Sequence, residues 1–314
     1  MRKLIYSLVI ALLLCNYCFA QSIIDPELQI VLDDTNKDSS ESISINIIFK
    51  SQLNVDELNQ RANNYNNKNH KRQYVISELK NFSEKTQQEV LSIIKAEENR
   101  GEVSNIICHW LSNSITCNAT KDVIEELSKR EDILMIGYNC DRDALLTNEE
   151  VTIETHSSRA SEADITNNVV QVSAPEVWDL GYTGEGVLVA LLDTGVNYEH
   201  IDLADHLWDG GSQYPNHGYN SYDNNTVTID NRGHGTHCAG IICGDGTSGK
   251  NTGVAPNVTL MCVKALNDNG NANANSICSG MEFAVEHGAD VLSMSLGIAN
   301  ASVADRTMIR QTCV

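Results

Sequence analysis

Basic side chains are scarce in this 314-residue chain, where 22 lysines and arginines face 42 aspartates and glutamates, for a formal net charge of −20 at pH 7. Such a surplus of negative charge repels phosphate backbones and anionic lipid. The composition therefore argues against nucleic acid and against a membrane surface as partners. An apolar share of 41% is still enough for a folded core, and the length is enough for two ordinary domains.

Long apolar stretches are missing as well, except at the N-terminus. There Arg2 and Lys3 precede an apolar run over residues 4–14, and the segment ends with small residues at Cys18 and Ala20. A first transmembrane helix is the alternative, but the run is short for a hydrocarbon core of about 30 Å. We therefore expect residues 1–20 to be a signal peptide, and the product to be secreted, soluble and free of the membrane after cleavage.

The sequence after residue 20 lacks the common zinc motifs. It contains neither a C-x-x-C pair nor an H-E-x-x-H stretch. His234, His237 and Cys238 could still supply ligands, with His200 or His206 as a fourth. Histidines at i and i+3 without a following glutamate do not match the zinc-hydrolase pattern. A metal-dependent hydrolase is therefore the weaker interpretation of these residues.

Eight of the ten cysteines follow the signal, three in the first section and five near the end. Export permits disulfides, but odd numbers in both sections argue against a complete framework. A two-residue turn at Ser112-Asn113 would place Cys108 opposite Cys117 across a hairpin, within disulfide reach. Two separate buried thiols are the equally open alternative.

Residues 21–150 combine strand and helix patterns but contain no cluster of catalytic residue types. In "ESISINIIF" (41–49), apolar and polar residues alternate, which predicts an antiparallel strand with one buried face. Further patterns predict a long helix ending near Gly101, strands over 103–111 and 115–119, a short helix over 123–127 and a strand over 133–138. The order β-α-β-β-α-β predicts a small α+β ferredoxin-like domain, with helices on one face of its sheet.

The hydrophobic pattern of the chain changes after a polar segment. We interpret residues 151–168 of this segment as a processing linker. The runs "GVLVALLDTGV", "VTLMCVKAL" and "ADVLSMSLG" that follow are typical of parallel strands buried on both faces. Between the last two, a helical pattern has Asn275 or Ser276 as its N-cap and Gly288 beyond its end. Strands alternating with helices predict an α/β fold, a doubly wound parallel sheet, for residues 169–314.

Two motifs in this second part carry the residue types of acid–base catalysis. Asp193 directly follows an apolar run, which places it at the carboxyl end of a strand, where such sheets bind ligands. In "GHGTHCAG", Gly233 interrupts the chain and His234 begins a helix, with His237 one turn later. A carboxylate withdrawn from water can orient an imidazole and stabilise its charged form. We therefore predict an Asp193–His234 pair; a turn-capping aspartate and a core histidine are the alternatives.

Several motifs occur together in the order found in the subtilisin-like serine proteases, or subtilases (peptidase family S8). They are "GYTGEGV" (181–187), "LLDTGV" (191–196), "GHGTHCAG" (233–240), "TGVAP" (252–256) and "MSLG" (294–297). The chain resembles this family from about Val169 onward. The resemblance implies a secreted endopeptidase that hydrolyses peptide bonds with an Asp-His-Ser triad, in which Asp193 is the aspartate and His234 the general base.

The resemblance also implies where a substrate would bind. An extended peptide would pair with Ser295, Leu296 and Gly297 on one side of a cleft. On the other side it would meet Gly270 and Asn271. Protein or peptide substrates are the implied partners.

Further implications concern a thiol, a cation and the first section. Cys238 resembles the proteinase K-like branch, in which a free thiol lies under the catalytic histidine and confers sensitivity to mercurials. Asp202 matches a calcium-binding aspartate of many subtilases, which implies structural calcium and no cofactor for catalysis; a surface aspartate is the alternative. Residues 21–150 would be the protein's own propeptide, which lays its tail in the cleft until it is cut within 147–168.

The serine of the triad is the part that the sequence does not supply. The family order is Asp, His, Ser, but no G-T-S-x-A-type stretch follows His234, and Gly246-Thr247-Ser248 comes too early, in a loop. We expect residues 169–314 to be the N-terminal half of a truncated catalytic domain, inactive as it stands. The alternative is a product ending at Val314, either a non-catalytic remnant or a propeptide-like protein that binds and inhibits another protease.

Overall fold

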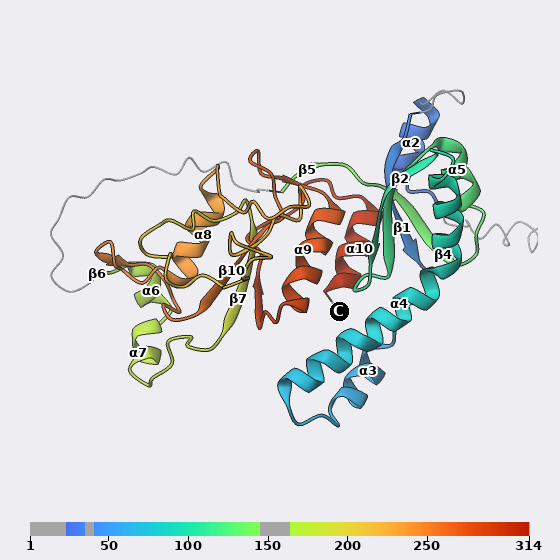
Figure 1. Cartoon of the computed structure of the whole chain (residues 1–314). Helices are drawn as coiled ribbons and strands as arrows, with labels where there is room; N and C mark the ends of the chain where they lie inside the picture. The colour runs from blue at the N-terminus through green and yellow to red at the C-terminus, as the bar shows by residue number, and fades with distance from the viewer. Residues whose placement is uncertain (1–22, 35–40, 145–163, 314) are drawn as a thin grey trace, which may run out of the picture.

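The computed structural model describes residues 23–34, 41–144 and 164–313 (Figure 1). The predicted signal peptide 1–20 and the predicted processing linker up to residue 163 lie outside these ranges. Within the described ranges, no helix has the length and apolar character needed to cross a membrane.

The first part of the chain is built on a four-stranded antiparallel sheet with the order β2-β3-β1-β4. Its strands are β1 (Ile43–Phe49), β2 (Val103–His109), β3 (Ser114–Ala119) and β4 (Ile133–Tyr138). Its helices are α2 (Pro26–Asp34), α3 (Val55–Ala62), α4 (Lys68–Glu98) and α5 (Lys121–Leu127). Apart from α2 and α3, this is the predicted order of elements. Helices α2, α4 and α5 bury apolar residues against one face of the sheet in a single core.

The second face of this sheet is also covered, contrary to the prediction of one solvent-exposed face. Asn46 and Ile48 of β1 are both fully buried. Ile48 packs with Met135 of β4 against helices α9 (Ala274–Glu286) and α10 (Val303–Thr312) of the second part. Figure 1 shows these two helices between the two sheets. The alternation in the sequence identified the strand correctly but could not reveal that a second unit covers its polar side.

The hairpin of β2 and β3 has a different register from the predicted one. Cys108 pairs with Ile115, and residues 110–113 form a four-residue loop. Gln87 of α4 holds this loop by donating to backbone carbonyl oxygens of both strands. Cys108 is exposed, Cys117 is buried, and both are free thiols. The structure thus contains two separate thiols and no disulfide between them.

The second part contains the predicted parallel sheet, with the order β12-β7-β10-β8. Its strands are β7 (Leu188–Asp193), β8 (Gly218–Tyr219), β10 (Thr259–Lys264) and β12 (Val291–Ser293). Alternate residues of β7 enter two different cores, because Ala190 and Leu192 pack on the side of α9, whereas Val189 and Leu191 pack on the side of α8 (His234–Cys243). Helices on both faces are the arrangement of a doubly wound sheet.

The end of the predicted linker is structured. Strand β6 (Asp164–Ile165) pairs with β9 (Lys250–Asn251), and the short helices α6 (Asn167–Gln171) and α7 (Ala174–Trp178) follow. Residues 164–168 therefore belong to the second part of the molecule, although their polar composition alone indicated a loop.

Two local predictions in the second part were wrong in detail. The N-cap of α9 is Asn273, which forms a capping box with Ser276, so the helix begins earlier than expected. Gly288 lies beyond its end with a φ of +89°, as predicted. Strand β12 lies at an edge of the described sheet, and Val291 is 48% exposed, so this strand is not buried on both faces.

Candidate active site

The site begins with Asp193, the last residue of β7. Because β7 lies between β10 and β12, the Asp193 side chain is fully buried at the carboxyl end of the sheet. One of its oxygens, Oδ1, accepts a hydrogen bond of 2.7 Å from the backbone N–H of Thr194. A buried carboxylate of this kind needs further donors, because desolvation penalises an unpaired charge.

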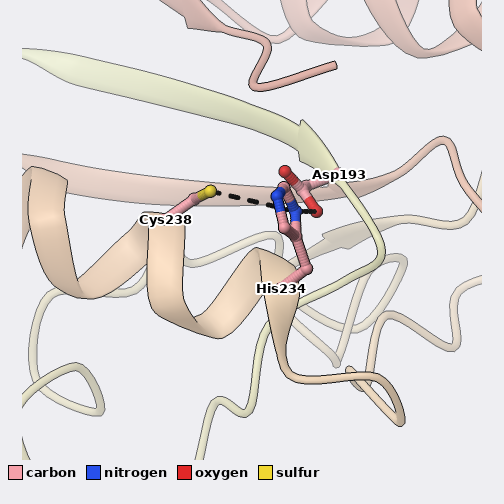
Figure 2. A group of neighbouring side chains, drawn as sticks. All are labelled: Asp193, His234 and Cys238. Atoms are coloured by element: carbon pink, nitrogen blue, oxygen red, sulfur yellow. Dashed lines mark hydrogen bonds and ion pairs between the residues drawn. The ribbon is translucent and has the colours of Figure 1, made fainter. Parts of the chain in front are cut away.

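His234 supplies such a donor from the first turn of α8 (Figure 2). Its Nδ1 lies 2.7 Å from Asp193 Oδ1, and its side chain is 24% exposed. With Nδ1–H directed at the carboxylate, Nε2 is left to accept a proton. No serine hydroxyl in the described ranges hydrogen-bonds to His234. The predicted pair of Asp193 and His234 is therefore brought together, with the geometry of an oriented general base.

A glycine permits the close approach that joins these two residues. A Cβ on Gly235 would lie 2.0 Å from the carbonyl oxygen of Gly195, in the turn after β7. Any larger residue would push the start of α8 away from the end of β7. The glycine after His234 in the motif is thus a packing requirement of the pair.

Asp230 was not identified from the sequence, although it holds the start of α8 in place. Its carboxylate accepts from the backbone N–H groups of Arg232, Gly233 and Thr236, and from the hydroxyls of Thr194 and Thr236. Burial favours the neutral carboxyl, but these hydrogen bonds outweigh it and lower the pKa of Asp230. An aspartate shortly before a helix start is the signal that could have revealed it.

The third side chain in Figure 2 is Cys238, one helical turn after His234. Its Sγ lies 3.9 Å from His234 Nδ1, and it is a buried, free thiol. Burial, together with the nearby Asp193 carboxylate, raises its pKa to about 11, against a smaller opposing effect of a hydrogen bond with Ser295. At neutral pH the free thiol is therefore uncharged and a poor nucleophile.

We expect Cys238 to react slowly with iodoacetamide below pH 9. With a pKa of about 11, roughly one thiol in a thousand is ionised at pH 8, and the rate should rise about tenfold per pH unit up to that pKa. Peptide mapping by mass spectrometry would follow this site, with the exposed Cys313 as internal control. Equal alkylation of both cysteines at pH 7.5 would contradict the expectation. Sensitivity to mercurials stays a prediction.

The alternative zinc ligands do not all lie at one place. His237 is exposed and lines a cavity of about 560 Å³ with His200 and Asp202, away from the His234–Asp193 contact. In the described part of the chain, two groups of three potential ligands lie close together: Asp193, His234 and Cys238, and separately Asp205, His206 and Asp245. In the first group, His234 Nδ1 lies 2.7 Å from Asp193 Oδ1.

Calcium at Asp202 stays a prediction, and its surroundings do not fit that ion well. Both carboxylate oxygens accept from Ser248, one from the backbone N–H at 2.5 Å and the other from the hydroxyl at 2.6 Å. Asp202 belongs to neither of the two groups of potential ligands found in the described ranges. Calcium prefers six to eight oxygen ligands, so we derive no role for it here.

The predicted substrate-binding residues border a groove that a strand from the first part occupies. Strand β5 (Arg142–Asp143) pairs antiparallel with β11 (Asn271–Ala272), so that Arg142 lies opposite Ala272. The next residue, Ala144, donates to Gly270 O at 3.0 Å and accepts from Gly297 N at 3.0 Å. Gly270, Asn271 and Gly297 thus hold an extended backbone between them.

The two remaining predicted residues lie beside this strand. Leu296 packs in the same apolar core as Ala144, and it lines a cavity of about 400 Å³ with Met294 and Gly297. Ser295 is exposed, and its hydroxyl lowers the pKa of the Cys238 thiol, against the larger effect of burial.

Comparisons with known proteins agree with this geometry. Residues 184–312 match the family model described as "Subtilase family". The chain is 37% identical to "Minor extracellular protease Vpr" of Bacillus subtilis over 163 residues, 47% of the chain and 19% of that protein. It is 28% identical to "Bacillopeptidase F" of the same organism over 218 residues, 67% of the chain and 15% of that protein.

A third relative, "Subtilisin DY" of Bacillus licheniformis, is 40% identical over 134 residues, 42% of the chain and 45% of that protein. The chain thus spans less than half the length of each of these three relatives. Residues 184–312 are therefore similar to the subtilase family.

Proposed function

We propose that this chain carries two of the three triad residues of a secreted subtilisin-like serine endopeptidase precursor. The observation that supports this most directly is the 2.7 Å contact between His234 Nδ1 and the fully buried Asp193 carboxylate. The similarity of residues 184–312 to the subtilase family supports a serine-type hydrolase of proteins or peptides. The signal pattern in residues 1–20 and the name of the Vpr relative support secretion.

In the proposed reaction, a serine hydroxyl attacks the carbonyl carbon of a peptide bond while His234 Nε2 accepts its proton. Asp193 holds the imidazole in the tautomer with Nδ1–H and stabilises the imidazolium that forms. His234 then donates the proton to the leaving amine, and water repeats the sequence on the acyl-enzyme. Because no serine of the described ranges hydrogen-bonds to His234, we propose that the nucleophile comes from another part of the protein and that these residues alone are inactive.

We further propose that residues 21–150 act as a ferredoxin-like propeptide, with 151–168 as a processing linker cut within 147–168. The packing of the first sheet on α9 and α10 supports this role, as does the position of β5 in the groove. An extended strand that adds to β11 in cis would exclude an extended substrate from the same edge.

The test is labelling and hydrolysis by the full-length protein, expressed from its complete coding sequence. A fluorophosphonate probe should label one serine, and quenched peptides should be cleaved after processing. His234→Ala should abolish both, because the serine then lacks its base. His237→Ala, on the exposed side of the same helix, is the matched control and should retain both.

A second candidate is a non-catalytic protein that binds and inhibits another protease. The observation in its favour is that the first part already occupies a substrate-like groove through β5. Under this alternative, the full-length protein would remain unlabelled by the probe, and its residues 21–150 would inhibit an added subtilisin. Labelling that depends on His234 would exclude it.

A further inference from the structure

Arg142 is the charged residue of β5 whose side chain is largely buried. Its side chain is 10% exposed and lies between two carboxylates from different parts of the molecule. Nε donates to Asp305 Oδ2 at 2.6 Å, and the two Nη atoms donate to Glu27 at 3.2 and 2.5 Å. All the hydrogen bonds of this guanidinium are therefore to charged acceptors, which are stronger than neutral ones.

The carboxylates of Glu27 and Asp305 differ in their exposure and in the part of the molecule that positions them. Glu27 belongs to α2, in the first part, and its side chain is 39% exposed. Asp305 belongs to α10, in the same part as His234, and its side chain is only 2% exposed. The capping box fixes Asp305, because the carboxylate accepts from Ser302 N at 3.0 Å while Ser302 Oγ accepts from Asp305 N at 3.1 Å. Asp305 is thus fixed by its own helix in the second part, whereas Glu27 is held by a helix of the first part.

The register of β5 determines which residue of an incoming peptide would meet Asp305. Arg142 lies opposite Ala272, and Ala144 bonds to Gly270 and Gly297 two positions later. A peptide that adds to β11 in the same direction would use the same backbone groups, and its residue opposite Ala272 would point where Arg142 points now. A neutral side chain there would leave the buried Asp305 carboxylate without a cationic partner, which is costly.

Building on the proposed function, we propose that Asp305 makes this groove selective for substrates with a basic residue, arginine above lysine, opposite Ala272. Arginine is favoured because its guanidinium presents several donors in a fixed plane, whereas lysine offers a single ammonium on a flexible stem. Asp305 is in this view a specificity-determining residue of the groove, and Arg142 is the side chain by which the protein's own tail mimics a preferred substrate.

The experiment measures binding and does not depend on catalysis. The full-length protein carries His234→Ala, so that no peptide is consumed. It also carries Glu27→Gln, Arg142→Glu and Ala144→Pro, which remove the charge of the second carboxylate, the ion pairs of the tail and the hydrogen bond of the tail to Gly270. Fluorescein-labelled peptides of residues 139–146 with Cys140→Ser, bearing Arg, Lys or Leu at position 142, are titrated and followed by fluorescence anisotropy.

We expect the peptide with Arg to bind at least about tenfold more tightly than the peptide with Leu, because it gains a charged hydrogen bond to a buried acceptor. Lysine should lie between them. Asp305→Asn should reduce the difference to less than about twofold, whereas Asp305→Glu, which keeps the charge, should preserve a preference. Asp209→Asn, which removes an exposed carboxylate that accepts from Gly211 N and not from Arg142, is the matched control and should leave the difference unchanged.

Equal affinities for the Arg and Leu peptides would overturn the proposal, as would the absence of binding by any of the three. A preference that survives Asp305→Asn would do the same, because another residue would then be responsible. None of these outcomes depends on hydrolysis, so the proposed protease function would still stand or fall on the fluorophosphonate test.

Discussion

The full-length protein carrying Asp193→Asn is expected to hydrolyse peptides with a kcat about 10⁴-fold below that of the unmodified protein. An amide at this position could donate to His234 Nδ1, which would favour the wrong tautomer and place the proton on Nε2. The 2.7 Å contact and the full burial of Asp193 leave no water to replace the carboxylate. In subtilisin itself, loss of the triad aspartate costs about 3 × 10⁴ in kcat.

Steady-state hydrolysis of a quenched peptide would measure this effect, with active-site titration to correct for the amount of processed protein. Asp209→Asn is the matched control, because Asp209 is exposed and its only hydrogen bond in the described structure is from the neighbouring Gly211 N. It should leave kcat within about twofold, as surface substitutions away from a site usually do. An Asp193→Asn protein as fast as the control would remove Asp193 from the mechanism.

The second large effect is expected at the contact between the two parts of the molecule. Glu282 of α9 accepts from Leu111 N at 2.9 Å, and its other oxygen lies 3.2 Å from Nδ1 of the fully buried His109. Glu282→Ala would leave both groups without their partner inside the interface. Such losses cost about 3 kcal/mol, so the first part should bind the second more weakly by about two orders of magnitude.

Hydrogen exchange measured by mass spectrometry would detect this weakening as faster exchange in β2 and β3. Glu286→Ala is the control on the same helix, because its ion pair with Lys80 is between side chains that are 34% and 43% exposed. Exposed pairs contribute about 0–1 kcal/mol, so exchange should hardly change. Similar exchange in both variants would show that the Glu282 contact does not hold the parts together.

Much of the local structure could be predicted from the sequence because it depends on neighbouring residues. The apolar run before Asp193 predicted a buried parallel strand, and β7 has that form, with alternate residues in two cores. Gly233 before His234 predicted a helix start, and α8 begins at His234 with Gly233 as its N-cap at a φ of +95°. In each case the signal is a period or a backbone preference that acts within one turn or one strand.

Contacts between distant segments were decided only by the tertiary structure. The second face of β1 is buried because α9 and α10 pack on it, and no alternation in residues 43–49 could reveal that. Gln87 reaches the loop of the β2–β3 hairpin from α4 and donates to backbone carbonyl oxygens of both strands, a contact that neighbouring residues could not reveal.

The sequence by itself determined the elements of the site and their residue types: an aspartate at a strand end, a histidine at a helix start and a thiol one turn later. The tertiary structure determined which other residues these side chains contact. It joined His234 to Asp193 across 41 positions, directed the oxygens of Asp202 to Ser248, and set Arg142 against Asp305 across 163 positions. The physical reason is that periodicity and capping are satisfied within a few residues, whereas a buried charge selects its partner only when packing brings distant segments to the same place.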